Sequence, residues 1–582
     1  MTFFKIISIG IITLLLSSNI SFGQTKTEQL DELLGKYLEY GQFNGSVLVA
    51  DEGKVIYKKG FGMANMEWDI PNTSTTKHRL GSVTKQFTAM LILQLVAEGK
   101  LDLQKPITTY LPDYPKGNGD IITTHHLLTH TSGIPNYTSF PGFFENESRN
   151  PYTPSEFLEK FQDMTLDFTP GDHFSYSNSG YFLLGAIIEK LTGKSYEQML
   201  HDNIFKPLGM ANSGYDNHED ILKERATGYG KNGSGFVNSN FLDMSIPYAA
   251  GSLYSTVEDL YIWDQALYTN KLLSEKLMTL YFTPYIPAWG EAQYAYGWGI
   301  GYEPIGNTDD SIAVMSHGGG INGFNTIISR STSDKSLVVL LNNTGGAPLN
   351  EMTRAIRGIM NGTTYDLPKQ SLAYDVLRVI KADGIDAAVK HFKAHKTSES
   401  FHFSENGMNQ IGYQLMGDGL VKEAAEVFKI NIDEFPKSAN AYDSYAEALM
   451  NLKDTKGAIK NYRIAVKMNP ANTAAIKLLK KLGDDTSDLE TEITVADAIL
   501  ETYIGDYGLA PGFILTISKD GNQLKAQATG QGMFDVFPSS DTEFYLKVIE
   551  AQITFNVNEN GEVKSLTLFQ GGQEMVGEKV VK

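Results

Sequence analysis

The pattern of apolar residues changes twice along this chain, and each change limits what the segment can fold into. In residues 24–362, strand-like runs at both ends enclose a middle rich in helix and loop signals. Residues 363–486 have a helical pattern, and residues 487–582 alternate short strand-like runs with turn signals. The chain has 582 residues, so at about 150 residues per domain we expect several domains, each with its own core.

The first segment predicts an antiparallel sheet built from both of its ends. Phe43–Ala50 and Val55–Phe61 are joined by a turn signal, which is typical of a β-hairpin. Ser311–His317, Phe324–Arg330 and Ser336–Asn342 are further strand-like runs. The middle, rich in Pro and Gly, then forms a helical subdomain beside the sheet, so we expect an α+β domain.

The second segment repeats itself every 34 residues. Pro436 recurs as Pro470, and Phe428 recurs as Tyr462. This period resembles the tetratricopeptide (TPR) repeat, in which helix pairs stack because one pair cannot bury its own apolar face. The segment is therefore predicted to be a short TPR-like helical array. It either spaces the flanking domains or binds a protein partner.

The third segment predicts a small all-β domain, either a sandwich or a barrel. Turn signals at 519–522 and at 560–561 separate strand-like runs. Tyr503 and Tyr507 near its start are interpreted as core and turn residues. No catalytic pattern stands out in this segment.

Residues 1–23 are predicted to be a signal peptide. Lys5 precedes the apolar run Ile6–Leu16, and the small-residue site Ser21-Phe22-Gly23 follows. The run is too short for a stable membrane span, and no later run matches it in hydrophobicity. We expect an exported protein, periplasmic or secreted, without stable membrane insertion; an uncleaved anchor is the alternative.

Composition excludes several classes of function. Lys plus Arg total 49 against 68 for Asp plus Glu, and a net charge of −19 argues against nucleic acid as a partner. With no cysteine, the chain has no disulfide, no thiolate metal site and no cysteine nucleophile. A metal site at His125, His126 and His130 is a weak alternative, since no His-Glu-x-x-His pattern occurs. We expect neither metal nor cofactor.

A candidate nucleophile lies at the start of an apolar helix. Ser82 and Lys85 are three residues apart, so they share one face of the first turn of the helix that continues through 88–97. That helix is apolar on all sides and is therefore buried. Burial disfavours the charged lysine, and a neutral lysine can take the proton of a serine. A second Ser-x-x-Lys at Ser74 and Lys77 lies in a polar loop, so this spacing alone is weak evidence.

Two further segments carry suitable groups. Tyr176 and Asn178 lie in one turn-rich loop, where the phenol could move a proton if a neighbouring cation lowers its pKa, and the amide could bind an acyl substrate. His317, Gly319 and Gly320 belong to a glycine-rich strand edge that a substrate can approach closely.

Together, these three motifs resemble the active-site motifs of the serine β-lactamase and penicillin-binding-protein family, which includes class C β-lactamases, DD-peptidases and esterases. The segments 127–135 and 250–256 resemble supporting stretches of the same family. The resemblance covers about residues 24–343. It implies a β-lactamase-like fold and hydrolysis through an acyl-enzyme.

The resemblance also implies a role for each matching residue. Ser82 is then the acylated nucleophile, Lys85 its base and Tyr176 the proton relay. Asn178, His317 and Gly319 bind substrate, and the backbone N–H groups of Ser82 and Gly320 hold the oxyanion.

One departure from the family pattern bears on the substrate. Most β-lactamases have Lys-Thr-Gly or Lys-Ser-Gly where this chain has His317-Gly318-Gly319, so a mostly neutral imidazole replaces a fixed ammonium. We therefore expect a serine hydrolase acting on small-molecule or peptide substrates, either D-amino-acid peptides or acyl esters. A class C-like β-lactamase or D-alanyl-D-alanine carboxypeptidase is one alternative, and a non-catalytic protein that binds cell-wall fragments is the other.

Overall fold

The structure is a computed structural model, and it describes residues 24–232, 235–470, 472–489, 494–510, 513–529, 531–546, 551–558, 561–570 and 573–580. The expected signal peptide, residues 1–23, lies outside the described residues. Within them, no helix combines the length and the hydrophobicity needed to cross a bilayer.

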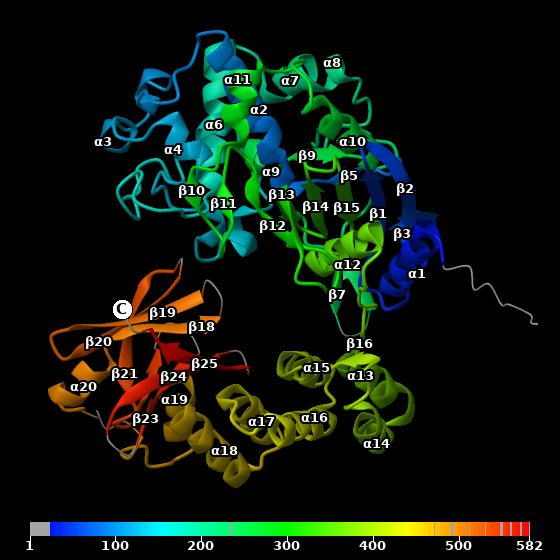
Figure 1. The fold of residues 1–582 in the computed structure, drawn as a ribbon. Helices are drawn as coiled ribbons and strands as arrows, with labels where there is room; N and C mark the ends of the chain where they lie inside the picture. Colours follow the sequence, from blue (N-terminus) through cyan, green and yellow to red (C-terminus); the bar gives the residue numbers. More distant parts are fainter. Residues whose placement is uncertain are drawn as a thin grey trace, which may run out of the picture.

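An antiparallel sheet of eight strands forms the centre of the first domain (Figure 1). Its order is β10-β11-β12-β13-β14-β15-β1-β2. The hairpin near the N-terminus adds directly to the strands near residue 340, because β1 pairs with β15 from Gly45 opposite Asn342 to Ala50 opposite Leu337. The predicted sheet made from both ends is thus confirmed. The strands are β1 (Gly45–Asp51), β2 (Lys54–Phe61), β10 (Ile286–Pro287), β11 (Gln293–Tyr294), β12 (Gly299–Pro304), β13 (Ser311–Ile321), β14 (Phe324–Arg330) and β15 (Leu337–Asn342).

Strands β1 and β15 are largely apolar because both faces of the sheet are buried there. Side chains alternate between the two faces of a strand. On β1, Leu48 and Ala50 join the core on the side of the large helical subdomain, whereas Val47 and Val49 join the core on the opposite side. A continuous apolar run, rather than an alternating one, is what such a three-layer arrangement requires.

Helices cover both faces of the sheet. On one face, α1 (Lys26–Glu39) and α12 (Leu349–Asn361) pack against β2, β14 and β15. On the other face lie the apolar α2 (Thr84–Ala97), α6 (Asn178–Thr192) and α10 (Val257–Ala266), together with the smaller elements of the helical subdomain. The smaller helices are α3 (Lys116–Gly119), α4 (Thr124–Leu128), α5 (Pro154–Leu158), α7 (Tyr196–Leu200), α8 (Lys206–Leu208), α9 (Tyr248–Gly251) and α11 (Glu275–Phe282).

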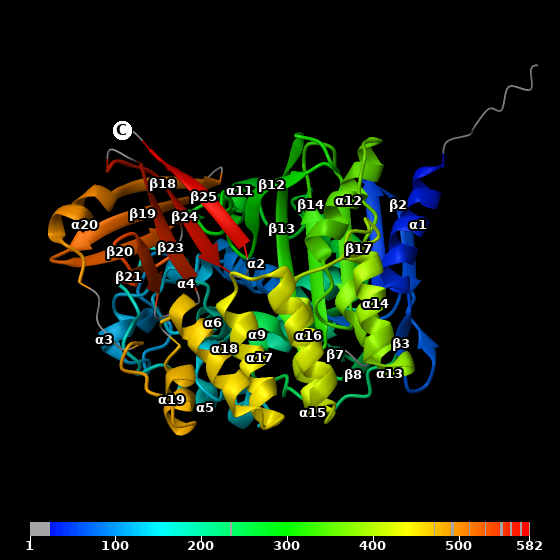
Figure 2. The ribbon, with the colours of Figure 1, turned by 90° about the horizontal axis from the view of Figure 1, so that it is seen from below.

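Seven helices follow in a row that leads from α12 toward the C-terminal domain (Figure 2). They are α13 (Leu372–Asp383), α14 (Ile385–His395), α15 (Glu405–Gly417), α16 (Val421–Glu434), α17 (Ala439–Asn451), α18 (Thr455–Met468) and α19 (Thr473–Lys481). The pair α17 and α18 repeats the bounds of α15 and α16 with a step of 34 residues, as the sequence repeat requires. Whether the array belongs to the TPR family stays a prediction.

The C-terminal domain is a closed barrel. Its strands are β18 (Gly505–Ala510), β19 (Phe513–Asp520), β20 (Gln523–Ala528), β21 (Met533–Pro538), β22 (Glu543–Leu546), β23 (Ala551–Val557), β24 (Val563–Gln570) and β25 (Gln573–Lys579), and β18 pairs with β25 to close it. Tyr503, at the end of α20 (Asp497–Tyr503), and Tyr507 are buried in its core, as expected.

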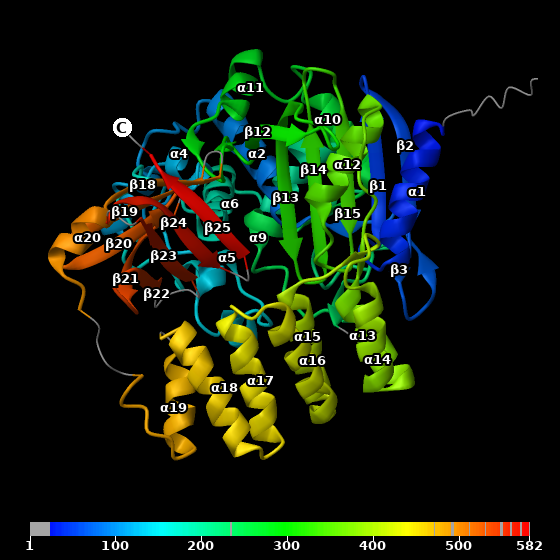
Figure 3. The same cartoon turned by 60° about the horizontal axis from the view of Figure 1, so that its bottom comes forward.

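The barrel lies at the far end of the helical row, on the same side of the molecule as α4 and α6 (Figure 3). Lys437, in the turn between α16 and α17, forms an ion pair with Glu574 of β25. Its ammonium also lies 5.5 Å from the ring centre of Phe569. These contacts join the last two parts of the chain.

Candidate active site

Ser82 and Lys85 meet where the first turn of a buried helix begins. Ser82 lies in the 3₁₀ turn Gly81–Val83, directly before α2, and Lys85 lies in the first turn of α2. The prediction that both residues share a first α-helical turn was therefore wrong for Ser82. The tighter turn still brings the two side chains together, because the Lys85 ammonium donates to Ser82 Oγ at 3.0 Å.

Burial shapes the chemistry of Lys85. Its side chain is fully buried, and this desolvation holds its pKa well below the ordinary value. Nζ also donates to Asn178 Oδ1 at 2.8 Å and to the Ala250 carbonyl at 2.9 Å. Three acceptors satisfy the three protons of an ammonium. A neutral amine keeps two of these bonds and turns its lone pair toward Ser82, so the arrangement suits a base.

Tyr176 lies beside both groups. The Lys85 ammonium is 4.8 Å from the centre of its ring, and Tyr176 and Ser82 line the same pocket. Burial raises the pKa of Tyr176 above its ordinary value, and a hydrogen bond to Ser82 opposes this only in part. Lys85 lies beside the ring, yet the pKa of Tyr176 stays above its ordinary value. The phenol keeps its proton at neutral pH and can donate it.

Asn178 is the first residue of α6 rather than part of a loop. Besides accepting from Lys85, it is held by Asn136, whose Oδ1 accepts from the Asn178 backbone N–H at 3.0 Å and from its Nδ2 at 3.3 Å. Asn136 was missed in the sequence, because it lies 42 residues away and no motif includes it. Its role follows only from the fold.

Glycines let strand β13 pack backbone to backbone against the turn that carries Ser82. A Cβ atom on Gly319 would lie 1.9 Å from the Leu80 carbonyl oxygen, and one on Gly81 would lie 2.9 Å from the Gly320 nitrogen. Gly81 also has φ +54°, a backbone conformation that is less strained for glycine than for any other residue. Thr326 Oγ1 donates to the Leu80 carbonyl at 2.8 Å and fixes the approach. The backbone of Gly320 therefore lies next to Ser82.

His317 is neutral and buried at this edge of the sheet. Burial, reinforced by the charge of Lys85, lowers its pKa to about 4. Nδ1 bonds the Gly318 carbonyl at 2.6 Å, so Nδ1 carries the proton and Nε2 accepts from the Tyr294 hydroxyl at 2.9 Å. The imidazole therefore presents no positive charge to a ligand above about pH 4.

Ser82 lines two different pockets. One, of about 390 Å³, contains Asn178 and Gly320 and has apolar walls that include Phe143, Leu242 and Ile246. The other, of about 670 Å³, contains Tyr176 and His317 and is bordered by Trp289, Glu291 and Glu303. Among the described residues that line the second pocket there is no lysine or arginine.

Neither rival pattern in the sequence forms a site. The other Ser-x-x-Lys is split, because Ser74 donates to Glu258 and Lys77 donates to the Lys223 carbonyl. His126 lies in α4 and His130 lies beyond its end, so the two do not share a helix face. The described part of the chain contains no cluster of three or more potential metal ligands of the His, Asp or Glu type.

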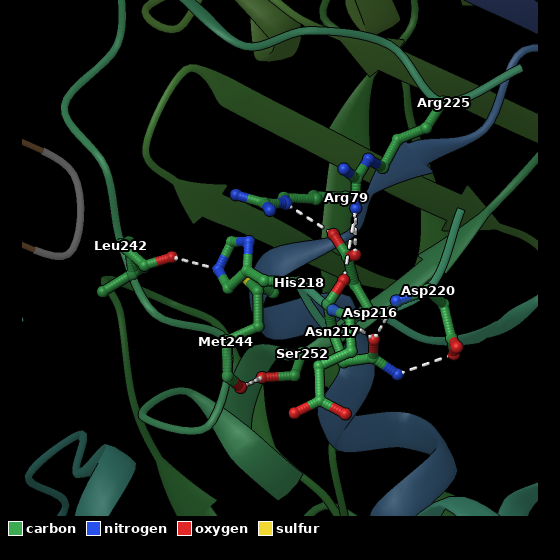
Figure 4. A network of polar contacts seen from close by, with 10 residues as sticks. Arg79, Asp216, Asn217, His218, Asp220, Arg225, Leu242, Met244 and Ser252 are labelled. Carbon is green, nitrogen blue, oxygen red and sulfur yellow. Dashed lines mark hydrogen bonds and ion pairs between the residues drawn. The ribbon is translucent and has the colours of Figure 1, made fainter. Parts of the chain in front are cut away.

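A buried ion-pair network supports the segment that leads into Ser82 (Figure 4). Asp216, whose side chain is 1% exposed, accepts from Arg79 Nε and from Arg225 Nη1, each at 2.6 Å. Arg79 lies in β5 (His78–Arg79), three residues before Ser82, and pairs with Tyr254 of β9 (Leu253–Ser255). Asp216 directly follows β6 (Gly214–Tyr215), which pairs with the same β9. The network thus ties the strand before the nucleophile to its sheet.

Comparison with known proteins identifies the family of the first domain. The β-lactamase family model matches residues 30–360, and a domain of unknown function, DUF3471, matches residues 489–579. The Bacillus subtilis protein PbpX, described as a penicillin-binding protein, is 33% identical over 339 residues, which cover 58% of this chain and 80% of that protein. A teichoic acid D-alanine hydrolase of Staphylococcus aureus is 30% identical over 353 residues, covering 60% of this chain and 80% of that one.

One solved structure is similar along nearly the whole chain. The octameric penicillin-binding protein homologue from Pyrococcus abyssi aligns with a TM-score of 0.50 and covers 94% of this chain and 99% of its own. Its 22% identity supports the shared fold alone. Since the family model spans more than half of the sequence, this chain belongs to the β-lactamase family of penicillin-binding-protein-like serine hydrolases.

Proposed function

We propose that this enzyme hydrolyses esters or amides of acyl groups and D-amino acids through an acyl-enzyme on Ser82. The single observation that carries the proposal is the buried Lys85 amine, 3.0 Å from Ser82 Oγ. A serine hydroxyl needs a base to become a nucleophile, and a desolvated lysine is such a base.

In the proposed reaction, Lys85 takes the proton of Ser82 while Oγ attacks the substrate carbonyl carbon. The backbone N–H groups of Ser82 and Gly320 stabilise the oxyanion. The bond to the leaving group then breaks, Tyr176 gives its proton to the leaving atom, and Lys85 returns a proton to Tyr176. Water attacks the acyl-enzyme, releases the acid and restores Ser82. Asn178 orients the acyl part.

The leaving group is proposed to carry no carboxylate. Because Tyr176 protonates it, the leaving group lies in the larger pocket with His317. His317 is neutral there, Glu291 is acidic, and Arg357 is already bound by Glu303 at 2.6 Å. A C-terminal carboxylate or a penicillin carboxylate would find no counter-charge among the described lining residues, which favours alcohol, amine or amide leaving groups over both.

The acyl group is proposed to be apolar next to the carbonyl. It lies on the side of Asn178 and Gly320, where Phe143, Leu242 and Ile246 form the walls. The similar hydrolase from Staphylococcus aureus is named for teichoic acid D-alanine, so D-alanyl esters belong in the same test.

The expected signal peptide supports action outside the cytoplasm. The domain boundaries 24–362, 363–486 and 487–582 remain our proposal.

The first experiment labels the protein lacking residues 1–23 with a fluorophosphonate and compares its peptide map with that of Ser82→Ala. We expect labelling confined to Ser82 and none in the variant. The Ser74→Ala variant is the matched control. In the parent protein, Ser74 has the same spacing to a lysine as Ser82, but it donates a hydrogen bond to Glu258. A folded protein that is not labelled would contradict the proposal and favour a binding protein for cell-wall fragments.

The second experiment compares the turnover of matched substrates by the unlabelled enzyme. A D-alanyl peptide ending in an amide should be cleaved faster than the same peptide ending in a carboxylate, and short acyl esters should react faster than a chromogenic cephalosporin. Faster turnover of the carboxylate peptide or the cephalosporin would instead support the carboxypeptidase or β-lactamase alternative.

A further inference from the structure

His130 lies behind Tyr176, in a conformation unusual for a residue other than glycine. The residue is 1% exposed, and its φ is +58°. A left-handed backbone conformation at a residue other than glycine costs free energy. It is retained where surrounding contacts stabilise it. It follows α4 in the segment before Asn136, and none of the roles proposed above uses it.

Two hydrogen bonds join His130 to the residues on either side of Tyr176. The Ser175 backbone N–H donates to the His130 carbonyl at 2.8 Å. The Ser177 backbone N–H donates to His130 Nδ1 at 3.1 Å. The left-handed backbone turns the carbonyl and the imidazole toward the same segment, so one residue binds both peptide groups that flank Tyr176.

The ring of His130 also supports the phenol directly. The two ring centres are 4.2 Å apart with an angle of 32° between the planes. On its other sides, the imidazole packs against Tyr181, with ring centres 5.0 Å apart, and against Tyr294, with ring centres 4.8 Å apart. A shift of His130 would therefore move the Tyr176 ring and not only its backbone.

The hydrogen bond from Ser177 fixes the protonation of the imidazole. A backbone N–H can only donate, so Nδ1 is an acceptor and the proton of the neutral ring is on Nε2. Lys85 and His317 are the basic groups facing this ring, and Tyr176, Tyr181 and Tyr294 are its phenol neighbours. Burial holds the pKa of His130 well below its ordinary value, and Lys85 acts in the same direction.

We propose that His130 is a positioning residue, which acts through Tyr176 by holding Ser175, Ser177 and the phenol ring in the geometry that delivers a proton to the leaving group. The inference rests on the proposed reaction at Ser82. It assigns no contact between His130 and substrate. Misplacing a catalytic group by about 1 Å can slow a reaction about 100-fold.

The test compares two substitutions of similar polarity. His130→Asn places an amide oxygen near the position of Nδ1, whereas His130→Gln places its amide group near Nε2. With an acyl ester as substrate, we expect kcat to fall about tenfold or more in His130→Gln, with KM within about threefold, and His130→Asn to recover part of the loss. His125→Gln is the control, because His125 bonds Tyr296 and does not contact Tyr176.

A double-mutant cycle with Tyr176→Phe separates positioning from a general structural effect. If His130 acts through the phenol, His130→Gln should change kcat by less than about threefold in the Tyr176→Phe background. An equal loss in both backgrounds, or equal activity of the Asn and Gln variants, would overturn the proposal. Thermal unfolding shows whether each variant folds. If His130→Gln does not fold, His130→Asn replaces it in the double-mutant cycle. Inactivity of Ser82→Ala tests the reaction itself separately.

Discussion

In the proposed reaction, His317 determines the charge beside the leaving group. It occupies the strand position where most β-lactamases of the family carry a lysine, and its burial keeps it neutral above about pH 4. In the proposed reaction, this one side chain on β13 distinguishes substrates with a carboxylate from those without one. The same neutrality favours Lys85 as a base, because a second cation nearby would repel the ammonium that forms when Lys85 takes the proton of Ser82.

His317→Lys is expected to change specificity rather than general activity. An ammonium at this position would attract a carboxylate, so KM for a D-alanyl peptide with a free C-terminus should fall about tenfold, while KM for its amide changes little. Steady-state kinetics on the two peptides measure the ratio. A ratio equal to that of the parent enzyme would show that charge at this position does not select the leaving group.

The pH dependence of acylation should report Lys85. Only the neutral amine can take the Ser82 proton, and the pKa of Lys85 lies well below its ordinary value because the side chain is buried. The acylation rate is therefore expected to rise with pH and to level off at a pH below that at which an exposed lysine titrates. Pre-steady-state bursts with an acyl ester measure this profile. A rate that falls as pH rises from 5 to 8 would exclude Lys85 as the base.

At the scale of elements, three short strands hold the segment that precedes the nucleophile. β5, β6 and β9 each contribute two or three residues, yet they fix the segment that enters the turn of Ser82. Asp216 bonds Arg79 and Arg225, which anchor this sheet from one side (Figure 4). Backbone contact between β13 and Gly81 anchors it from the other.

Asp216→Ala should destabilise the protein by about 3 kcal/mol, because it leaves two poorly exposed guanidinium groups without their partner. Acylation should slow as well, since Arg79 precedes the nucleophile by three residues. Urea unfolding and fluorophosphonate labelling rates measure the two effects. Asp220→Asn, on the exposed part of the same loop, is the control and should change stability by less than about 0.5 kcal/mol. Equal effects of the two variants would remove Asp216 from this role.

At the scale of the whole molecule, buried histidines link stability to pH. His78 is fully buried, and burial lowers its pKa to about 4 from an ordinary value of 6.5. The unfolded chain then binds a proton between pH 6.5 and 4 that the native protein does not bind. The free energy of unfolding should therefore fall as pH falls through this window, by up to about 3 kcal/mol for this residue.

Urea unfolding of His78→Phe between pH 7 and 4.5 isolates the contribution of His78. The variant should be less stable at pH 7, because its ring cannot bond the Thr76 carbonyl, and its stability should depend less on pH than that of the parent. His173→Phe, at an exposed position, should leave the pH dependence unchanged. The same pH dependence in all three proteins would contradict this account.

Much of the architecture could be predicted because the signals are local. The hairpin that became β1 and β2, the 34-residue step of α15 to α18, and the turns between barrel strands each follow from residues close in sequence. Closure of the C-terminal strands into a barrel rather than a sandwich required the pairing of β18 with β25, about 70 residues apart, for which no local pattern exists.

The sequence by itself determined the order of domains, the burial of α2 and the residue types available for catalysis. Periodicity, apolar runs and short motifs are patterns of residues that are close in sequence, so they can be recognised without the fold. Only the tertiary structure decided the state of those residues. Burial lowers the pKa of Lys85, keeps the phenol of Tyr176 protonated and keeps His317 neutral. The contacts of Asn136 and His130 join residues more than 40 positions apart. A side chain's pKa is set by its surroundings in space.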